Sequence, residues 1–307
     1  MKFRSSAYKL AFAPIRLLGS LPLSFHYRMA KFITWILRDV LHYRRDVVMI
    51  NIARSFPQMC YTDMIATADR FYDHLGQIFA EAVWMAGCRN PQRFAKAALV
   101  EIEDAGPINE LYEKCADVVI LDSHTGNWEL TGGIASFWSR GEGLSFPERK
   151  FCVIYKALSS ALWDDVFKAM RLSPITDQSH VDDLVESGVA LRYILEHRGE
   201  HKLYDFKTDQ FPYGSSAKVD VGDFLNQPTT TMAGGATLAH KYGMGVAYMY
   251  MGHPERGHYT LKFAKICEDA SRMEVVDIMK EFYRMLEEDL KAQPYNYLWT
   301  HRRWKQD

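Results

Sequence analysis

The chain has no uninterrupted run of about 20 apolar residues, which is the length that a membrane-spanning helix needs. Its two most apolar N-terminal stretches, Leu10–Phe25 and Met29–Leu41, are both broken. The interruptions are Pro14, Arg16 and Pro22 in the first stretch and Lys31, Arg38 and Asp39 in the second. No compact apolar region ends in a small-residue cleavage site, so we expect no cleavable signal peptide.

Cysteine is scarce and scattered. The five cysteines, Cys60, Cys88, Cys115, Cys152 and Cys267, form no Cys-x-x-Cys pair. This argues against a zinc ribbon, a redox motif and a disulfide framework, and it favours a reducing compartment. His197 and His201 are spaced like two zinc ligands, but no Glu follows His197 and Gly199 lies between them, so we interpret this stretch as a helix end and turn. We therefore expect neither a metal nor a cofactor.

Charge is unevenly distributed along the 307 residues, whose net charge is −1. Residues 1–54 hold ten Lys/Arg and two acids, a net charge of +8, which leaves about −9 on the remainder. Each basic residue near anionic headgroups contributes about 1 kcal/mol to membrane binding. We expect residues 1–54 to be a basic helical segment that lies on or re-enters an anionic membrane surface. The alternatives are a segment that spans the membrane once and a set of ordinary amphipathic core helices.

A candidate catalytic motif follows the apolar run Asp117–Leu121. Residues 123–129 read SHTGNWE, which places His124 just past a buried strand and Glu129 five positions later. Gly126 allows a turn there and Asn127 can cap a helix that begins at Trp128, so the Glu129 carboxylate can fold back toward the imidazole. A histidine oriented by a carboxylate can act as a general base. A hydrogen-bonded structural histidine is the alternative.

The remaining pattern predicts an α/β protein with a largely parallel central sheet flanked by helices, in which residues 55–307 form one domain. The expected strands are Asp117–Leu121, Phe151–Tyr155, Val246–Met251 and Tyr259–Ala264, the last two as a hairpin; the expected helices are Asp63–Val83, Trp163–Leu172, Val181–His197 and Val275–Leu290. Glu81, near the end of the first helix, is expected to be solvated or to face the N-terminus.

Four segments resemble one known family. Residues 124–129 (HTGNWE) resemble the His-x4-Glu hallmark of glycerolipid-type acyltransferases, and their GNWE portion is similar to the bacterial lipid A late acyltransferases. Three other segments resemble that family in the same order: residues 44–57 (RRDVVMINIARSFP), residues 209–210 with 221–231 (DQ and VGDFLNQPTTT), and residues 297–305 (YLWTHRRWK). The sequence departs from the family's usual pattern at residues 122–123, at Thr125, at 155–157 and at 223–226. Some of these segments are expected to shape the acceptor pocket.

This resemblance implies a glycerol-3-phosphate acyltransferase-like fold and a reaction. A fatty acyl chain would pass from a thioester, of acyl carrier protein, to a hydroxyl of a membrane lipid, a lipid A precursor, at the cytoplasmic face of the bacterial inner membrane. The resemblance assigns catalysis to His124 as base with Glu129 as its partner. It makes Lys156 and Arg171 candidates for holding the acceptor's phosphate, with surface solvation as the alternative, and Asp209 a residue that contacts substrate or structures its loop. The side chain of Asn127 could donate to the oxyanion or cap the following helix. A coenzyme A donor, another lysolipid or an amino-acid lipid as acceptor, the acyl length and the oligomeric state are left open.

Other functions are also compatible with the pattern. An acyl-thioester hydrolase would use the same dyad with water as acceptor, and a non-catalytic membrane-associated protein would not need it. Ser123 as a nucleophile lacks the flanking glycines of a nucleophile elbow. The aromatic and basic stretch Trp299–Lys305 is too short a cluster to indicate nucleic-acid binding.

Overall fold

A computed structural model describes residues 5–88, 91–133, 140–141, 143–173, 184–214 and 216–304. The helices are α1 (Tyr8–Gly19), α2 (Leu23–Trp35), the π-helical η1 (Ile36–Val40), α3 (Arg45–Ser55), α4 (Tyr61–Ala86), α5 (Pro91–Ala97), α6 (Gly106–Lys114), the 3₁₀ helices η2 (Trp128–Gly133), η3 (Glu148–Lys150) and η5 (Ala270–Arg272), α8 (Ala161–Leu172), α9 (Ala190–Glu196), α10 (Gly234–Tyr242) and α11 (Val275–Ala292). The strands are β1 (Val100–Asp104), β2 (Val118–Asp122), β3 (Arg140–Gly141), β4 (Phe151–Tyr155), β5 (Leu184–Glu186), β6 (Leu203–Lys207), β7 (Lys218–Phe224), β8 (Gln227–Met232), β9 (Gly245–Glu255) and β10 (His258–Cys267).

The central sheet has the strand order β3-β1-β10-β9-β2-β6-β4-β5. All of its pairs are parallel except the β9–β10 hairpin, and β7 and β8 form a separate antiparallel pair. The predicted fold class is therefore confirmed. The carboxyl ends of β2, β6 and β4 lie side by side, which is the edge where open α/β sheets bind ligands.

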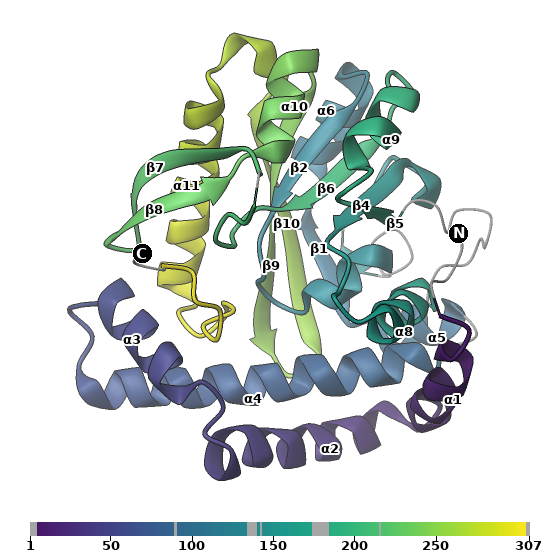
Figure 1. Ribbon diagram of the computed structural model, residues 1–307, viewed down its shortest axis with the longest axis vertical. Helices are drawn as coiled ribbons and strands as arrows, with labels where there is room; N and C mark the ends of the chain where they lie inside the picture. The colour runs from purple at the N-terminus through teal and green to yellow at the C-terminus, as the bar shows by residue number, and fades with distance from the viewer. Residues whose placement is uncertain are drawn as a thin grey trace.

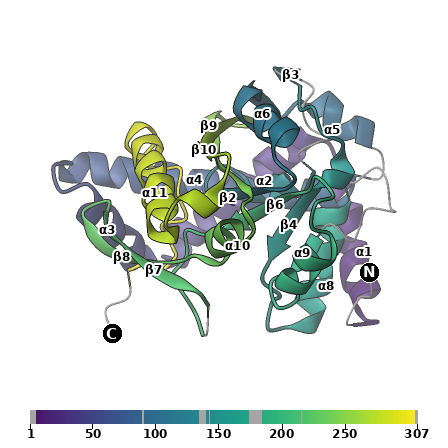
Figure 2. The same ribbon diagram turned by 90° about the horizontal axis from the view of Figure 1, so that it is seen from above.

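Helices cover both faces of the sheet, and β2 shows how the sequence provides for this. Every residue of β2 is buried, so Val119 and Leu121 pack into one core cluster with α10 and α11 while Val118 and Ile120 pack into a second cluster with α6. Figure 2 shows α6 on one side of the sheet and α10 on the other. Continuous apolar strands are the expected result of such double coverage.

The N-terminal helices pack against α4. In Figure 1, α4 crosses one end of the sheet and α2 runs alongside it, farther from the sheet. The end of α1 meets the end of α4 at two glycines, where a Cβ on Gly19 would lie 2.2 Å from the Val83 carbonyl oxygen. Phe12 of α1 packs between α4 and α8. Among the helices that the structure describes, none is both long enough and apolar enough to cross a bilayer.

Most of the expected elements are confirmed, with one clear error. The expected helix Val181–His197 is instead strand β5 followed by the short helix α9; residues 181–183 lie outside the described residues. Leu184 and Val185 pair with Val153 and Ile154 of β4. A short apolar run fits either a strand or a buried helix. Here the run forms a strand, because it pairs with β4 at the end of the sheet.

Candidate active site

A tight turn at the end of β2 positions His124. Gly126 has φ +57°, and a Cβ there would lie 2.4 Å from Cγ of Met251, so both the backbone conformation and the space favour glycine. The backbone N–H of Gly126 donates to Oδ1 of buried Asn296, at 2.8 Å. The loop that carries the histidine is therefore held from the C-terminal part of the chain.

Asn127 supports the same loop from within. Its side chain is fully buried; Oδ1 accepts the backbone N–H of Glu129 at 3.2 Å, and Nδ2 donates to Oε2 of Glu81 at 2.8 Å. Both polar ends of the side chain are thus occupied, and the expected helix cap is confirmed. The side chain was also predicted to bind substrate, but these contacts give it a supporting position.

Glu81, in α4, lies at the centre of this support. It is fully buried, not solvated as one expectation had it, and it accepts hydrogen bonds from the Tyr27 hydroxyl (3.1 Å), the Asn127 amide (2.8 Å) and the Tyr259 hydroxyl (2.7 Å). Burial raises the pKa of Glu81 to about 7, although these three hydrogen bonds oppose the rise. One carboxyl group therefore joins the N-terminal helix α2, the loop that carries His124 and β10.

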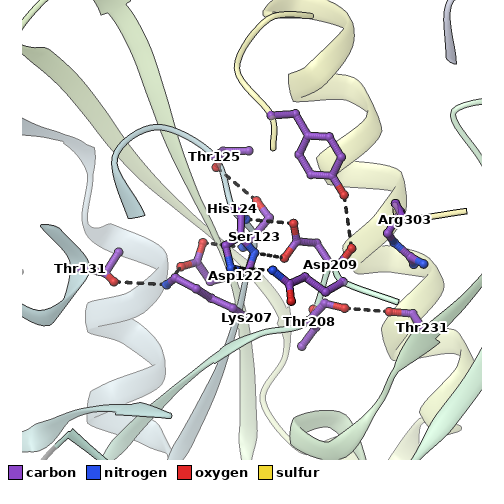
Figure 3. Close-up of polar contacts among 12 residues, drawn as sticks. Asp122, Ser123, His124, Thr125, Thr131, Lys207, Thr208, Asp209, Thr231 and Arg303 are labelled. Atoms are coloured by element: carbon purple, nitrogen blue, oxygen red, sulfur yellow. Dashed lines mark hydrogen bonds and ion pairs between the residues drawn. The ribbon is translucent and has the colours of Figure 1, made fainter. Parts of the chain in front are cut away.

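The imidazole of His124 pairs with Asp209 and not with Glu129, which corrects the predicted dyad. Its Nδ1 lies 2.7 Å from Oδ1 of Asp209, and its backbone N–H donates to Oδ2 at 3.0 Å. Figure 3 shows the two side chains facing each other. The cause is the sheet register: Asp122 of β2 pairs with Lys207 of β6, and His124 and Asp209 each lie two residues farther along.

Glu129 binds elsewhere because the 3₁₀ helix η2 carries it toward α8. Its two carboxylate oxygens accept from Nε and Nη2 of Arg171 at 2.7 and 3.0 Å, a bidentate pair. Burial raises the pKa of Glu129, but the charge and hydrogen bonds of Arg171 outweigh this effect and leave it below its usual value. Glu129 is thus an ionised partner of a cation inside the site.

The hydrogen bonds around His124 determine its tautomer. Burial raises the pKa of Asp209, but the charge of His124 and its hydrogen bonds outweigh this, so the net pKa is lowered and the carboxylate accepts. Nδ1 must then carry a proton, since a carboxylate has none to donate. Nε2 lies 3.2 Å from the amide nitrogen of Gln210, a donor, and so presents a lone pair. This tautomer can take a proton from a hydroxyl.

A partly buried lysine, Lys207, joins the strand ends beside the histidine. Nζ of Lys207 lies 2.6 Å from Asp122, 3.3 Å from Asp205 and 3.2 Å from the Thr131 hydroxyl. Ser123, the alternative nucleophile, is fully buried, and its hydroxyl lies 3.2 Å from that of Thr125. Ser123 therefore contributes to the packing beneath the loop.

A cavity of about 690 Å³ opens beside His124. Of the predicted substrate-binding residues, Lys156 and Arg171 line the cavity. Asp209 and Asn127 do not line it; Asp209 contacts His124, which does, and Asn127 contacts Glu81. Nζ of Lys156 lies 3.1 Å from the centroid of the Tyr213 ring. The cavity is lined by polar residues, among them His124, Glu129, Lys207 and Gln210, and by aliphatic residues of β4, β5, α9 and α10.

Within the described ranges there is no group of three or more His, Cys, Asp or Glu side chains arranged to hold a metal ion. His197 pairs instead with Glu200, at 3.2 Å. None of the five cysteines, all of which lie within the described residues, forms a disulfide.

Sequence comparison identifies one family. The family model described as "Bacterial lipid A biosynthesis acyltransferase" matches residues 2–306, nearly the whole chain. A search of curated proteins found no match.

Proposed function

Because the chain belongs to the bacterial lipid A biosynthesis acyltransferase family, and is therefore an acyltransferase enzyme, we propose a specific reaction for its cavity. A fatty acyl chain passes from the thioester of acyl carrier protein to a hydroxyl of a lipid A precursor, with His124 as the general base. The single observation that carries this proposal is the Asp209–His124 pair: its imidazole lines the cavity, and its Nε2 presents a lone pair that accepts from the Gln210 amide.

The proposed mechanism needs no covalent enzyme intermediate, because a thioester is already activated. Nε2 of His124 takes the proton of the acceptor hydroxyl as its oxygen attacks the thioester carbonyl. Asp209 stabilises the imidazolium that forms, and its lowered pKa keeps it ionised for that purpose. The proton then passes from His124 to the departing thiolate, so that the base is regenerated.

Cations in the cavity support a phosphorylated acceptor. Arg171 is bound to Glu129, which holds its planar guanidinium in one orientation. Lys156 has no carboxylate within ion-pair distance among the described residues, so its charge is available to a phosphate. As a point charge it recognises phosphate less selectively than an arginine fork does.

We also propose that the enzyme binds the cytoplasmic face of the inner membrane through residues 1–54, which carry the charge of +8. Large apolar side chains in this segment are at least half exposed: Leu10, Leu17, Phe32, Trp35, Val40, Leu41 and Ile50. Exposed apolar side chains mixed with basic residues suit an anionic membrane surface.

The test is the variant His124→Ala, assayed for acyl transfer from an acyl carrier protein thioester to a lipid A precursor by mass spectrometry. We expect turnover to fall by about 10²–10⁴-fold while vesicle binding is unchanged. The matched control is His258→Ala, since His258 also pairs with a carboxylate, Glu101 at 3.1 Å, but lies outside the cavity. Retained turnover in His124→Ala would overturn the assignment of the base, and release of free fatty acid without acyl-lipid would indicate a hydrolase.

A further inference from the structure

We propose that Arg303, which follows α11 near the C-terminus, is a positioning residue for catalysis, because it anchors the loop that presents Asp209 to His124. It acts through Tyr283 of α11 and Thr231 of β8, and we call Arg303, Tyr283 and Thr231 together the C-terminal relay. This proposal rests on the proposed function, since His124 and Asp209 are the pair to which that function assigns proton abstraction.

Arg303 is a buried charge without a counter-ion. It is 2% exposed, and no carboxylate lies within ion-pair distance of its guanidinium among the residues that the structure describes. Its Nη1 donates to the Thr230 carbonyl oxygen and its Nη2 to the Tyr283 hydroxyl, both at 2.8 Å, while Nε has no described partner. Removing a charge from water without a counter-ion costs free energy, so stability alone does not account for an arginine here.

The hydrogen bonds of the C-terminal relay all run in one direction. A guanidinium has no acceptor atom, so the Tyr283 hydroxyl must accept from Arg303 and donate its own proton elsewhere. That hydroxyl lies 2.7 Å from the Thr231 hydroxyl and 3.3 Å from the Thr208 carbonyl oxygen. The Thr231 hydroxyl donates to the same carbonyl oxygen at 2.8 Å. Arg303 thus directs two hydroxyl groups toward one backbone oxygen, that of Thr208.

Thr208 precedes Asp209, and the backbone of both residues is held from several elements. The Thr208 N–H donates to the Asp122 carbonyl oxygen at 3.0 Å, which continues the pairing of β6 with β2. The Asp209 carbonyl oxygen accepts from the buried Tyr297 hydroxyl at 3.3 Å. Figure 3 shows the hydrogen bond from Thr231 to Thr208 next to Asp209. The loop is therefore fixed through its backbone, which leaves both carboxylate oxygens of Asp209 for the histidine opposite.

Electrostatic attraction also connects Arg303 with Asp209. Burial lowers the pKa of the Arg303 guanidinium, but two buried phenols and the Asp209 carboxylate outweigh this effect and raise it overall. Arg303 is thus a cation within electrostatic reach of Asp209. The attraction is mutual, so Arg303 favours the ionised form of Asp209, which is the form that accepts from the imidazole.

The first test measures kcat and KM for acyl transfer by the full-length enzyme. We expect Arg303→Met to lower kcat by about 10²-fold with KM nearly unchanged, because the C-terminal relay does not line the cavity and a displacement of about 1 Å would misplace Asp209. Arg303→Lys keeps a donating cation and should recover most of this loss. A kcat within about threefold of wild type in Arg303→Met would overturn the inference.

The variant Tyr283→Phe makes the test independent of whether Arg303→Met folds. It removes one hydroxyl from the C-terminal relay and should lower kcat by about tenfold. The matched control is Tyr248→Phe: Tyr248 is also buried, and its hydroxyl donates to Asp289 at 2.7 Å, away from the loop at 208–210. We expect this control to lose stability and keep its kcat. Equal losses of kcat in the two tyrosine variants would overturn the inference.

Nuclear magnetic resonance with ring-labelled histidine separates this inference from the proposed function. The signal of the Nδ1 proton of His124, identified by its absence in His124→Ala, reports the hydrogen bond to Asp209 without any turnover. A signal that changes in Arg303→Met and returns in Arg303→Lys supports the C-terminal relay even if the wild type transfers no acyl group, an outcome that would defeat only the proposed function. An unchanged signal in both Arg303→Met and Tyr283→Phe would overturn the relay.

Discussion

The substitution Asp209→Asn tests the corrected catalytic pair most directly. Asp209 is 2% exposed and accepts from both Nδ1 and the backbone N–H of His124, at 2.7 and 3.0 Å. An asparagine has a single acceptor oxygen. If that oxygen keeps the backbone N–H, its amide group donates to Nδ1 and moves the imidazole proton to Nε2, where it blocks proton abstraction.

The expected magnitude follows from the loss of the base. General base catalysis contributes about 10²–10⁴-fold, so kcat should fall by that factor while KM changes little, because Asp209 does not line the cavity. The assay is steady-state transfer from acyl carrier protein thioester to the lipid acceptor. A kcat within threefold of wild type would refute the assignment of Asp209 as the positioning partner of His124.

A matched control is Asp117→Asn at the other end of β2. Asp117 is also 2% exposed and accepts two backbone N–H groups, from Gly199 at 2.6 Å and Lys202 at 3.0 Å, but it is remote from His124 along the strand. We expect it to lose stability without a specific loss of kcat. The pKa of Asp209 is lowered in the folded state, so the stability it contributes is present above about pH 4 and is lost as the pH falls further.

Three further predictions concern the surroundings of the loop that carries His124. Burial raises the pKa of Glu81 from 4.5 to about 7, so the folded state holds this proton more tightly than the unfolded chain does, and the free energy of unfolding falls by about 3 kcal/mol as the pH rises through that window. Glu81→Gln should remove this dependence of stability on pH, measured by urea denaturation. An unchanged dependence would show that Glu81 is not its source. Gly126→Ala should cost about 3 kcal/mol, because it combines a left-handed backbone with a clash against Met251; a loss below about 0.5 kcal/mol in the same assay would show that the loop is not constrained in this way. A double-mutant cycle of Glu129→Gln and Arg171→Met should give a coupling energy of about 1–3 kcal/mol in thermal denaturation, and additive effects would argue against the bidentate pair.

Local sequence patterns were sufficient for most individual elements. The β-branched run before His124 forms β2, Phe151–Tyr155 forms β4 with the predicted bounds, and the apolar stripe after Glu274 forms α11. These signals are local because side-chain periodicity and turn residues act within a few positions. The same holds for the turn at Gly126 and the cap at Asn127, which follow from residue type and spacing.

Long-range arrangement required the tertiary structure. The sequence alone placed Glu129 beside His124 because it is near in the chain, whereas the structure brings Asp209 from 85 positions away. The pairing of β2 with β6 determines this, since two parallel strands deliver the residues beyond their ends to the same point. Buried Glu81 gave no signal either, because a carboxylate inside a helix usually faces solvent.

The sequence by itself thus determined most of the strands and helices that it predicted, and that a histidine follows a buried strand at the carboxyl edge of the sheet. Only the tertiary structure decided which carboxylate orients that histidine, which one binds Arg171, and that a cavity opens next to it. The physical reason is that hydrophobic periodicity depends on neighbouring residues, whereas strand register and helix packing join residues that are far apart in the chain.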